Sequence, residues 1–161
     1  MKDNTTISDS ARYKRIDLKN SKTLKVEGDV AIYVSGDVTL GNSVEIEIAD
    51  GASLVLYVGG DFESKNSAKI NVETKDAKKF LMLGLDSCED IDFKNSSEMY
   101  GMIYAPEADI VMHNSNKTWG AIVAKTLEFK NSGELHYDAY LRDLKPDNAP
   151  VRFVITNWHE K

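Results

Sequence analysis

Four aspartates stand at one place in a repeated sequence unit, and they are the first side chains in this chain that could bind a metal. They are Asp37, Asp61, Asp90 and Asp109, each directly before a short apolar stretch. Ca²⁺ prefers several oxygen ligands, which stacked carboxylates would supply. Gly36-Asp37 and Gly60-Asp61, however, are ordinary turn dipeptides. The calcium-binding pattern Gly-Gly-x-Gly-x-Asp is absent. We favour turn structure, and a melting temperature unchanged by excess chelator would decide against calcium.

A second candidate is the carboxylate pair Glu45 and Glu47, which flank Ile46. Side chains two residues apart on a strand project from the same side, and glycoside hydrolysis requires two carboxylates. The segment 44–48 also alternates like any half-exposed strand. A carbohydrate-active enzyme is therefore an alternative function, not the expected one.

Histidine and cysteine chemistry has weaker support. His136-Tyr137-Asp138 could pair a base with an orienting carboxylate, but no Gly-x-Ser-x-Gly nucleophile motif accompanies it. His113 stands where other units place lysine, and Cys88 has no positive neighbour to stabilise a thiolate. We therefore predict no enzyme, no catalytic or metal-binding residue and no cofactor.

The unit that carries these residues is defined by the dipeptide Asn-Ser, which recurs along the chain. Its asparagines are Asn20, Asn42, Asn66, Asn95, Asn114 and Asn131. The residue four before each asparagine is large and apolar, and the residue four after it is apolar in five of the six units. Agreement at both flanks indicates an internal repeat.

The repeat predicts an all-β, single-stranded parallel β-helix of about six coils, because each unit holds two or three short strands that must stack to bury a core. We expect a right-handed coil with short capping segments at both ends. The expected parts are an N-terminal capping segment over 1–15 with a short helix near 11–13, the β-helix over 16–144, and a C-terminal tail over 145–161. A helical turn is expected at 139–144 and a final strand at 151–158.

The Asn-Ser corner has an expected physical role. Asparagine tolerates positive φ better than most residues, so we place it at the sharp turn of each coil. Stacked asparagine amides can also donate and accept hydrogen bonds along a ladder. The six asparagines are therefore predicted to form a structural ladder along one corner.

Composition narrows the class of partner. The chain has 161 residues, a formal net charge of -6 and one cysteine. This acidic balance argues against a protein that binds nucleic acid through its phosphates, and a single cysteine excludes an internal disulfide. No apolar run approaches the roughly 18 residues of a membrane span, so no span is expected in this chain.

The region 100–141 carries the most distinctive sequence. It reads Tyr100-Gly101-x-Ile-Tyr104-Ala-Pro106, then Trp119-Gly120-Ala-Ile-Val, then His136-Tyr137-Asp138. This order resembles the C-terminal β-solenoid domain of PilX-type type IV pilus-assembly proteins and related bacterial surface domains. The resemblance covers about residues 24 to 144.

The resemblance implies a β-helix at the cell surface or outside the cell, with no enzymatic residues to transfer. The chain lacks the hydrophobic pilin-like helix of such proteins, so we expect an excised domain or a shorter relative. The expected function is a non-enzymatic structural or adhesive module whose partners are pilus or cell-surface proteins, or glycans. Its best candidate contacts are Tyr33, Tyr57, Tyr104 and Trp119. Alternatives are a carbohydrate-active enzyme or glycan-binding module, and an intracellular β-helical polymer.

Overall fold

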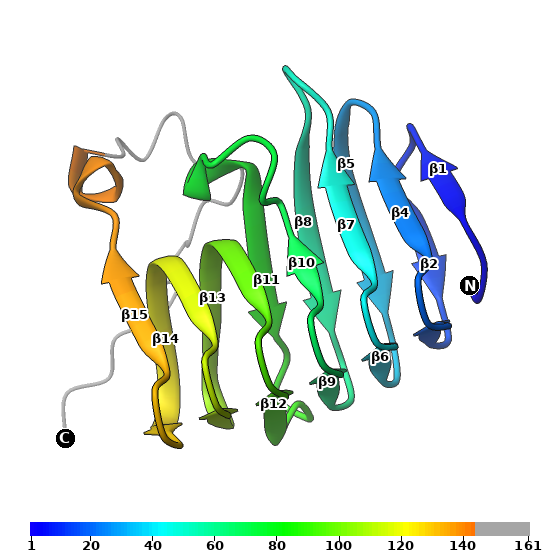
Figure 1. Ribbon diagram of the computed structural model, residues 1–161. Coiled ribbons are helices and arrows are strands. Elements are labelled where there is room, and N and C mark those ends of the chain that lie inside the picture. Colours follow the sequence, from blue (N-terminus) through cyan, green and yellow to red (C-terminus); the bar gives the residue numbers. More distant parts are fainter. Residues whose placement is uncertain (144–161) are drawn as a thin grey trace, which may run out of the picture.

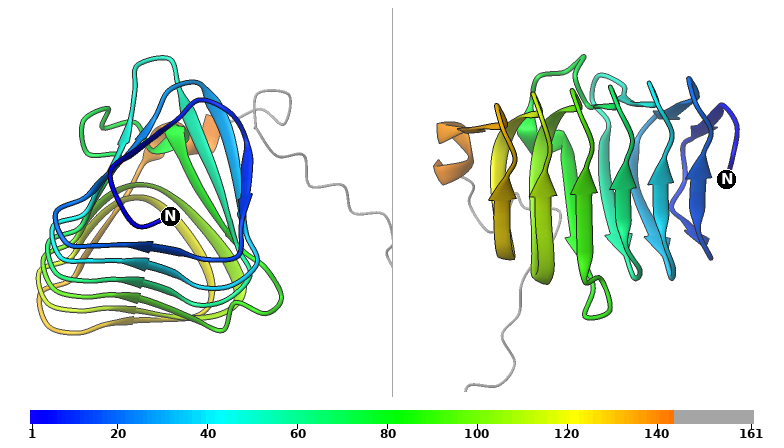
Figure 2. Two further views of the ribbon diagram at one scale, coloured as in Figure 1. Left: turned by 90° about the vertical axis from the view of Figure 1, so that its right-hand side faces the viewer. Right: turned by 60° about the horizontal axis from the view of Figure 1, so that its bottom comes forward.

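The computed structural model describes residues 1–143, and these form a parallel β-helix of about six coils (Figure 1). Viewed along its axis, the coil has a triangular outline with three sheet faces (Figure 2). The chain rises on the near side along β4 (Thr23–Val26) and descends on the far side along β5 (Asp29–Val34). It advances from right to left in Figure 1, so the coil is right-handed. The predicted fold class is confirmed.

Every strand pairs in parallel with the equivalent strand of the next coil. The first face contains β1 (Thr5–Ile7), β4, β7 (Glu45–Ile48), β10 (Lys69–Ile70) and β15 (Glu134–Tyr137). The second face contains β2 (Ala11–Tyr13), β5, β8 (Ser53–Val58) and β11 (Phe80–Gly84). The third face contains β3 (Ile16–Leu18), β6 (Val38–Leu40), β9 (Phe62–Ser64) and β12 (Asp90–Phe93). The long strands β13 (Glu98–Met112) and β14 (Lys117–Phe129) bend around the corners and contribute to all three faces.

One continuous core runs through the middle of the coils because strand residues alternate between inside and outside. In the first face, Leu24, Ile46, Ile70 and Met99 stack in register, and each is at most 2% exposed. In the third face the Phe62 and Phe93 rings contact each other at a tilt of 43°, with centroids 5.3 Å apart. The apolar positions that flank each Asn-Ser dipeptide therefore form columns of the core.

The left-handed residue of the corner is the serine, not the asparagine, in five of the six units. Ser21, Ser43, Ser67, Ser96 and Ser115 have φ between 54° and 59°. Only in the last unit does the asparagine, Asn131, take this conformation, with φ of 50°. The prediction was wrong for a physical reason. In four of the other five units the serine N–H points toward the next coil, where it donates to the following asparagine carbonyl (2.8–2.9 Å).

The asparagine side chains form three hydrogen-bonded pairs instead of a continuous ladder. Amide nitrogen to amide oxygen distances are 3.3 Å for Asn42 to Asn20, 3.1 Å for Asn95 to Asn66 and 2.5 Å for Asn131 to Asn114. Within residues 1–143, no side-chain bond joins Asn42 to Asn66 or Asn95 to Asn114. Three of the five neighbouring asparagine pairs are therefore bonded, and the predicted ladder is interrupted between them.

The N-terminal segment is already part of the solenoid. Residues expected as a cap with a helix near 11–13 form β1 and β2, which pair in register with β4 and β5. Residues 11–13 form a strand instead of a helix because Ala11 pairs with the core residue Ile32 and extends its sheet. Ahead of these strands, the Met1 and Lys2 carbonyls accept the Asp17 and Lys19 N–H groups (3.0 and 3.2 Å), and Met1 packs against the core.

At the other end, the expected helical turn is confirmed as the 3₁₀ helix η2 (Ala139–Asp143). A second 3₁₀ helix, η1 (Ala77–Lys79), lies in the longest coil. Neither of these two described helices is long and apolar enough to cross a membrane. The final strand expected at 151–158 and the tail at 145–161 lie outside the described residues.

Candidate functional site

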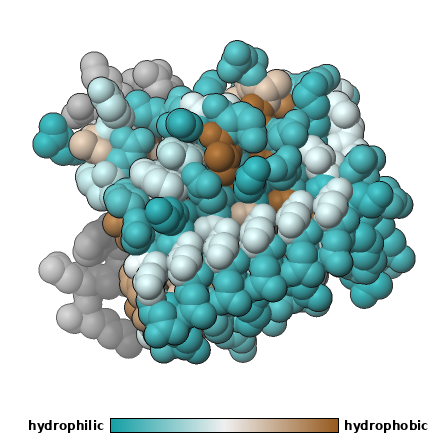
Figure 3. All heavy atoms as spheres, in the orientation of Figure 1, coloured by the Kyte–Doolittle hydropathy of each residue, from teal (hydrophilic) through white to brown (hydrophobic). Residues whose placement is uncertain are grey.

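The second face of the solenoid is apolar on its outer side as well as its inner side. Two columns of outward-pointing residues run across β5, β8, β11 and β13 in strict register. We call these eight residues the tyrosine face: Ala31, Val55, Leu81 and Met102 in one column, and Tyr33, Tyr57, Leu83 and Tyr104 in the other. By contrast, the outer side of the first face is mostly hydrophilic (Figure 3).

Exposure is uneven over the tyrosine face. Val55, Leu81 and Leu83 keep only 6–8% of their accessible surface and form a small apolar cluster of their own outside the main core. Tyr33 and Tyr104 are 39% and 37% exposed. The tyrosine rings therefore form the accessible part of an apolar surface, which is the arrangement expected of a contact site.

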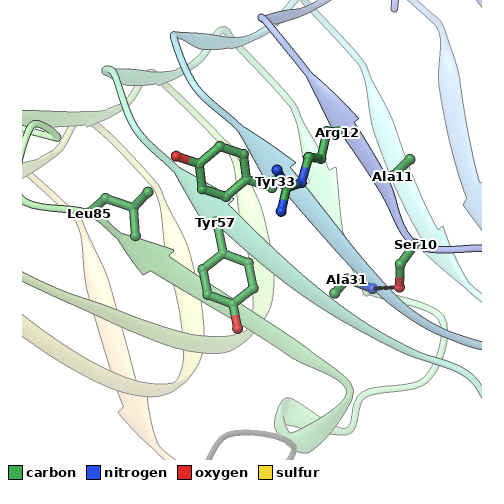
Figure 4. A pocket seen from close by; sticks show the side chains of 7 residues that line it. All are labelled: Ser10, Ala11, Arg12, Ala31, Tyr33, Tyr57 and Leu85. Atoms are coloured by element: carbon green, nitrogen blue, oxygen red, sulfur yellow. Dashed lines mark hydrogen bonds between the residues drawn. The ribbon is translucent and has the colours of Figure 1, made fainter.

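A hollow of about 520 Å³ lies beside the tyrosine face at its N-terminal end (Figure 4). It is lined by Ser10, Ala11, Arg12, Ala31, Tyr33, Tyr57 and Leu85. The Ser10 hydroxyl oxygen accepts the Ala31 N–H at 2.9 Å, which fixes the loop before β2 against β5. The walls of the hollow therefore come from three successive coils and the segment after β11.

The hollow combines aromatic and cationic groups. The Arg12 guanidinium carbon lies 5.6 Å from the centroid of the Tyr33 ring, and the Tyr33 and Tyr57 centroids are 6.4 Å apart. Flat rings can stack against apolar or sugar surfaces, and a guanidinium donates to planar oxygen acceptors. The chemistry of this site is recognition, with apolar contact from the rings and one cation for an oxygen-rich group.

Another aromatic column lies on the first face. The rings of Tyr100 and Trp119 stack with centroids 4.5 Å apart, and His136 stacks on Trp119 at 5.2 Å. The His136 Nε2 lies 2.9 Å from the Glu134 carboxylate, and this hydrogen bond lowers the pKa of Glu134. Of the four predicted contact aromatics, three share the tyrosine face and Trp119 does not.

Three of the four stacked aspartates bond to groups of the next coil. Asp37 Oδ1 accepts the Asp61 N–H and Asp61 Oδ1 accepts the Asp90 N–H, both at 3.2 Å. The Asp109 carboxylate instead accepts the Thr126 hydroxyl at 2.7 Å and lies 3.7 Å from Lys125 Nζ. Within the described part of the chain, no group of three or more ligand-type side chains could hold a metal ion. These bonds give Asp37, Asp61 and Asp109 partners in the next coil, and none of them is an Asx turn within one coil.

The candidate catalytic groups are placed apart from one another. Glu45 is ion-paired with Lys69 at 2.9 Å on the outer side of the first face. His136 pairs with Glu134, whereas Asp138 accepts the Tyr140 N–H and caps η2, so the structure does not join His136 and Asp138 as a base and its orienting carboxylate. Cys88 is fully buried, and burial raises the pKa of its thiol to about 11.

The remaining candidates have structural contacts. His113 Nε2 lies 3.1 Å from Asp92 Oδ1. Gly101 and Gly120 are paired in register where β13 and β14 approach closely. Pro106 lies half-buried near the corner of β13, and Tyr137 is 62% exposed on β15.

Two features of the site were missed by reasoning from the sequence. Arg12 was assigned to a capping helix, although its register with Tyr33 places it on the second face. The outward residues Val55, Leu81 and Leu83 were visible as parts of unbroken apolar runs at 54–58 and 80–83. A run without alternation indicates a strand that is apolar on both sides, and that signal would have identified the face.

Comparison with known proteins gives one match. The profile of a protein family described as Domain of unknown function (DUF7305) matches residues 2–144, which is nearly the whole of the described chain. Searches of curated proteins and of solved structures each found no match. The family description assigns no function, so the resemblance to pilus-assembly domains stays a prediction. The match spans well over half of the sequence, and the chain therefore belongs to the DUF7305 family.

Proposed function

We propose that this chain is a non-enzymatic structural or adhesive module of the cell surface, associated with a type IV pilus-like assembly. In this proposal the solenoid is a stiff support, and the tyrosine face with its hollow binds a partner protein or glycan. The observation that carries the proposal is the column of Tyr33, Tyr57 and Tyr104 on an apolar outer sheet face. The cell-surface and pilus parts rest on the sequence resemblance over 100–141.

Glycan binding is the more specific form of this proposal. The hollow offers the rings of Tyr33 and Tyr57 for stacking and the Arg12 guanidinium for hydroxyl or carboxylate oxygens. An acidic glycan suits this set best, because its carboxylates would meet the arginine while its sugar rings contact the tyrosines.

Two observations weigh against the alternative functions. Glu45 is ion-paired with Lys69 on the outer side of the first face, and it does not line the hollow beside Tyr33. The carbonyls of Met1 and Lys2 occupy the edge of β3, which an end-to-end polymer would need for pairing. We therefore favour a single binding module over an enzyme or a filament.

The test is binding to a panel of acidic and neutral polysaccharides, together with immunolabelling of intact cells. The double variant Tyr33→Ala, Tyr57→Ala is expected to lose at least tenfold in affinity, because each ring supplies about 1 kcal/mol or more at a contact surface. The matched control is Tyr137→Ala, which removes an exposed tyrosine from a different face. Release of reducing ends that Glu45→Gln abolishes, or labelling only after the cells are permeabilised, would reject the proposal.

A further inference from the structure

Each Asn-Ser corner places two groups side by side that can react with each other. Asparagine is one of the thermolabile residue types, because the main-chain nitrogen of the next residue can attack its side-chain amide carbon, Cγ. A small following residue such as serine leaves this approach open. In all six corners the serine is exposed to water. The six corners therefore offer the same reacting groups, and the hydrogen bonds of the coil distinguish them.

In four corners the attacking nitrogen is already engaged. The N–H groups of Ser21, Ser43, Ser67 and Ser96 each donate to the asparagine carbonyl of the next coil, at 2.8–2.9 Å. A nitrogen bonded in this way must leave its acceptor before it can lose its proton and turn toward its own asparagine. This opening step costs free energy and slows the attack. Stacking of the coils therefore protects the first four corners.

The fifth corner, Asn114-Ser115, lacks this protection. The Ser115 N–H has no acceptor among residues 1–143. The next corner gives the reason, because Asn131 itself takes the left-handed conformation, with φ of 50°, and its carbonyl accepts the N–H of Gly133. The carbonyl that would bind Ser115 in the pattern of the other corners is thus used within its own turn. The Ser115 nitrogen therefore stays available for attack.

The Asn114 side chain is also activated. Its Oδ1 accepts a hydrogen bond from Asn131 Nδ2 at 2.5 Å. Negative charge develops on this oxygen when a nucleophile adds to Cγ, and a donor held against it stabilises that charge. Asn20 and Asn66 have the same kind of donor, but the nitrogen of the serine that follows each of them is bonded. Within the described chain, only Asn114 combines a donor on Oδ1 with an unbonded serine nitrogen.

We propose that Asn114 is a site of spontaneous deamidation that reacts faster than the four protected corners. The Ser115 nitrogen loses its proton to solvent and bonds to Cγ, the bond from Cγ to Nδ2 breaks, and the nitrogen takes a proton from solvent and leaves as ammonia. A water molecule then opens the cyclic imide to an aspartate or an isoaspartate. The aspartate keeps an oxygen that accepts from Asn131, whereas the isoaspartate lengthens the main chain of the corner. This reaction is independent of ligand binding at the tyrosine face.

The first test follows deamidation of the full chain in mildly alkaline buffer. Each Asn-Ser peptide is quantified by mass spectrometry after digestion, because conversion of the amide to an acid raises its mass. In the folded protein Asn114 is expected to react at least about tenfold faster than Asn20, Asn42, Asn66 and Asn95. In urea, where the corners are lost, the five rates are expected to converge. Equal rates in the folded protein, or a lead of Asn114 that persists in urea, would overturn the proposal.

The second test removes the donor. Asn131→Gly deletes the amide that donates to Asn114 Oδ1 and keeps a residue that accepts positive φ. The Asn114 rate is expected to fall at least about twofold. The matched control is Asn95→Gly, which deletes the corresponding amide on Asn66 and is expected to leave the Asn114 rate unchanged. Equal Asn114 rates in the wild type and Asn131→Gly, or equal slowing in both variants, would overturn the activating role of Asn131.

Discussion

The replacement Gly120→Ala tests the close approach of β13 and β14. Gly120 has φ of 148°, and a Cβ placed there would lie 1.8 Å from the Gly101 carbonyl oxygen. Carbon and oxygen normally approach no closer than about 3.3 Å, so the strands would have to separate by roughly 1.5 Å at this point. No side-chain rotation can relieve the clash, because both atoms belong to fixed backbone positions.

The expected cost follows from two terms. Loss of two ladder hydrogen bonds removes about 2 kcal/mol, and an alanine in a backbone region that favours glycine costs about 1–3 kcal/mol. The free energy of unfolding should therefore fall by about 3–5 kcal/mol, which corresponds to a drop in melting temperature on the order of 10 °C.

The assay is urea unfolding followed by circular dichroism, with Gly51→Ala as the matched control. Gly51 also has positive φ, at 76°, but a Cβ there would meet nothing within 4 Å. Gly51→Ala should therefore cost only about 1 kcal/mol. If both variants lose the same free energy of unfolding with unchanged m-values, the close approach at Gly101 and Gly120 is refuted.

Three further predictions concern the corner, the cysteine and the aspartates. A double-mutant cycle on Asn66→Ala and Asn95→Ala should give a coupling energy of about 1 kcal/mol. The cycle on Asn42→Ala and Asn66→Ala should give none, and equal couplings would contradict the pairing. Because burial raises the pKa of Cys88 from 9.0 to about 11, its contribution to stability is complete below pH 9 and is lost as the pH rises to 11. The free energy of unfolding should fall over this range by more in the wild type than in Cys88→Ala, and parallel curves would count against it. Excess chelator should leave the melting temperature unchanged, whereas a fall would indicate a cation at the stacked aspartates.

Much of the fold could be predicted because the repeat acts at short range. The apolar columns that contain Leu24, Ile46 and Ile70 were visible as fixed offsets from each asparagine, and stacking is the only way such small units bury them. The conformation of the corner was not visible. Both residues of Asn-Ser are compatible with a turn, and the choice of the serine depends on which N–H must reach the next coil.

The candidate site was predictable only in part. Tyr33, Tyr57 and Tyr104 were identified as contact residues, but their alignment in one column with Leu83 depends on successive coil lengths of 24, 26 and 21 residues. Arg12 joined them because the first coil extends to the N-terminus.

The sequence by itself determined the class of the fold, since the recurrence of apolar residues around Asn-Ser requires stacked parallel strands. It also determined that no Gly-x-Ser-x-Gly nucleophile motif accompanies His136-Tyr137-Asp138. The tertiary structure alone decided which outer face is apolar and which groups of the next coil bond to Asp37, Asp61 and Asp109. Those features depend on register between coils, and register is set by packing across distant segments that no local pattern records.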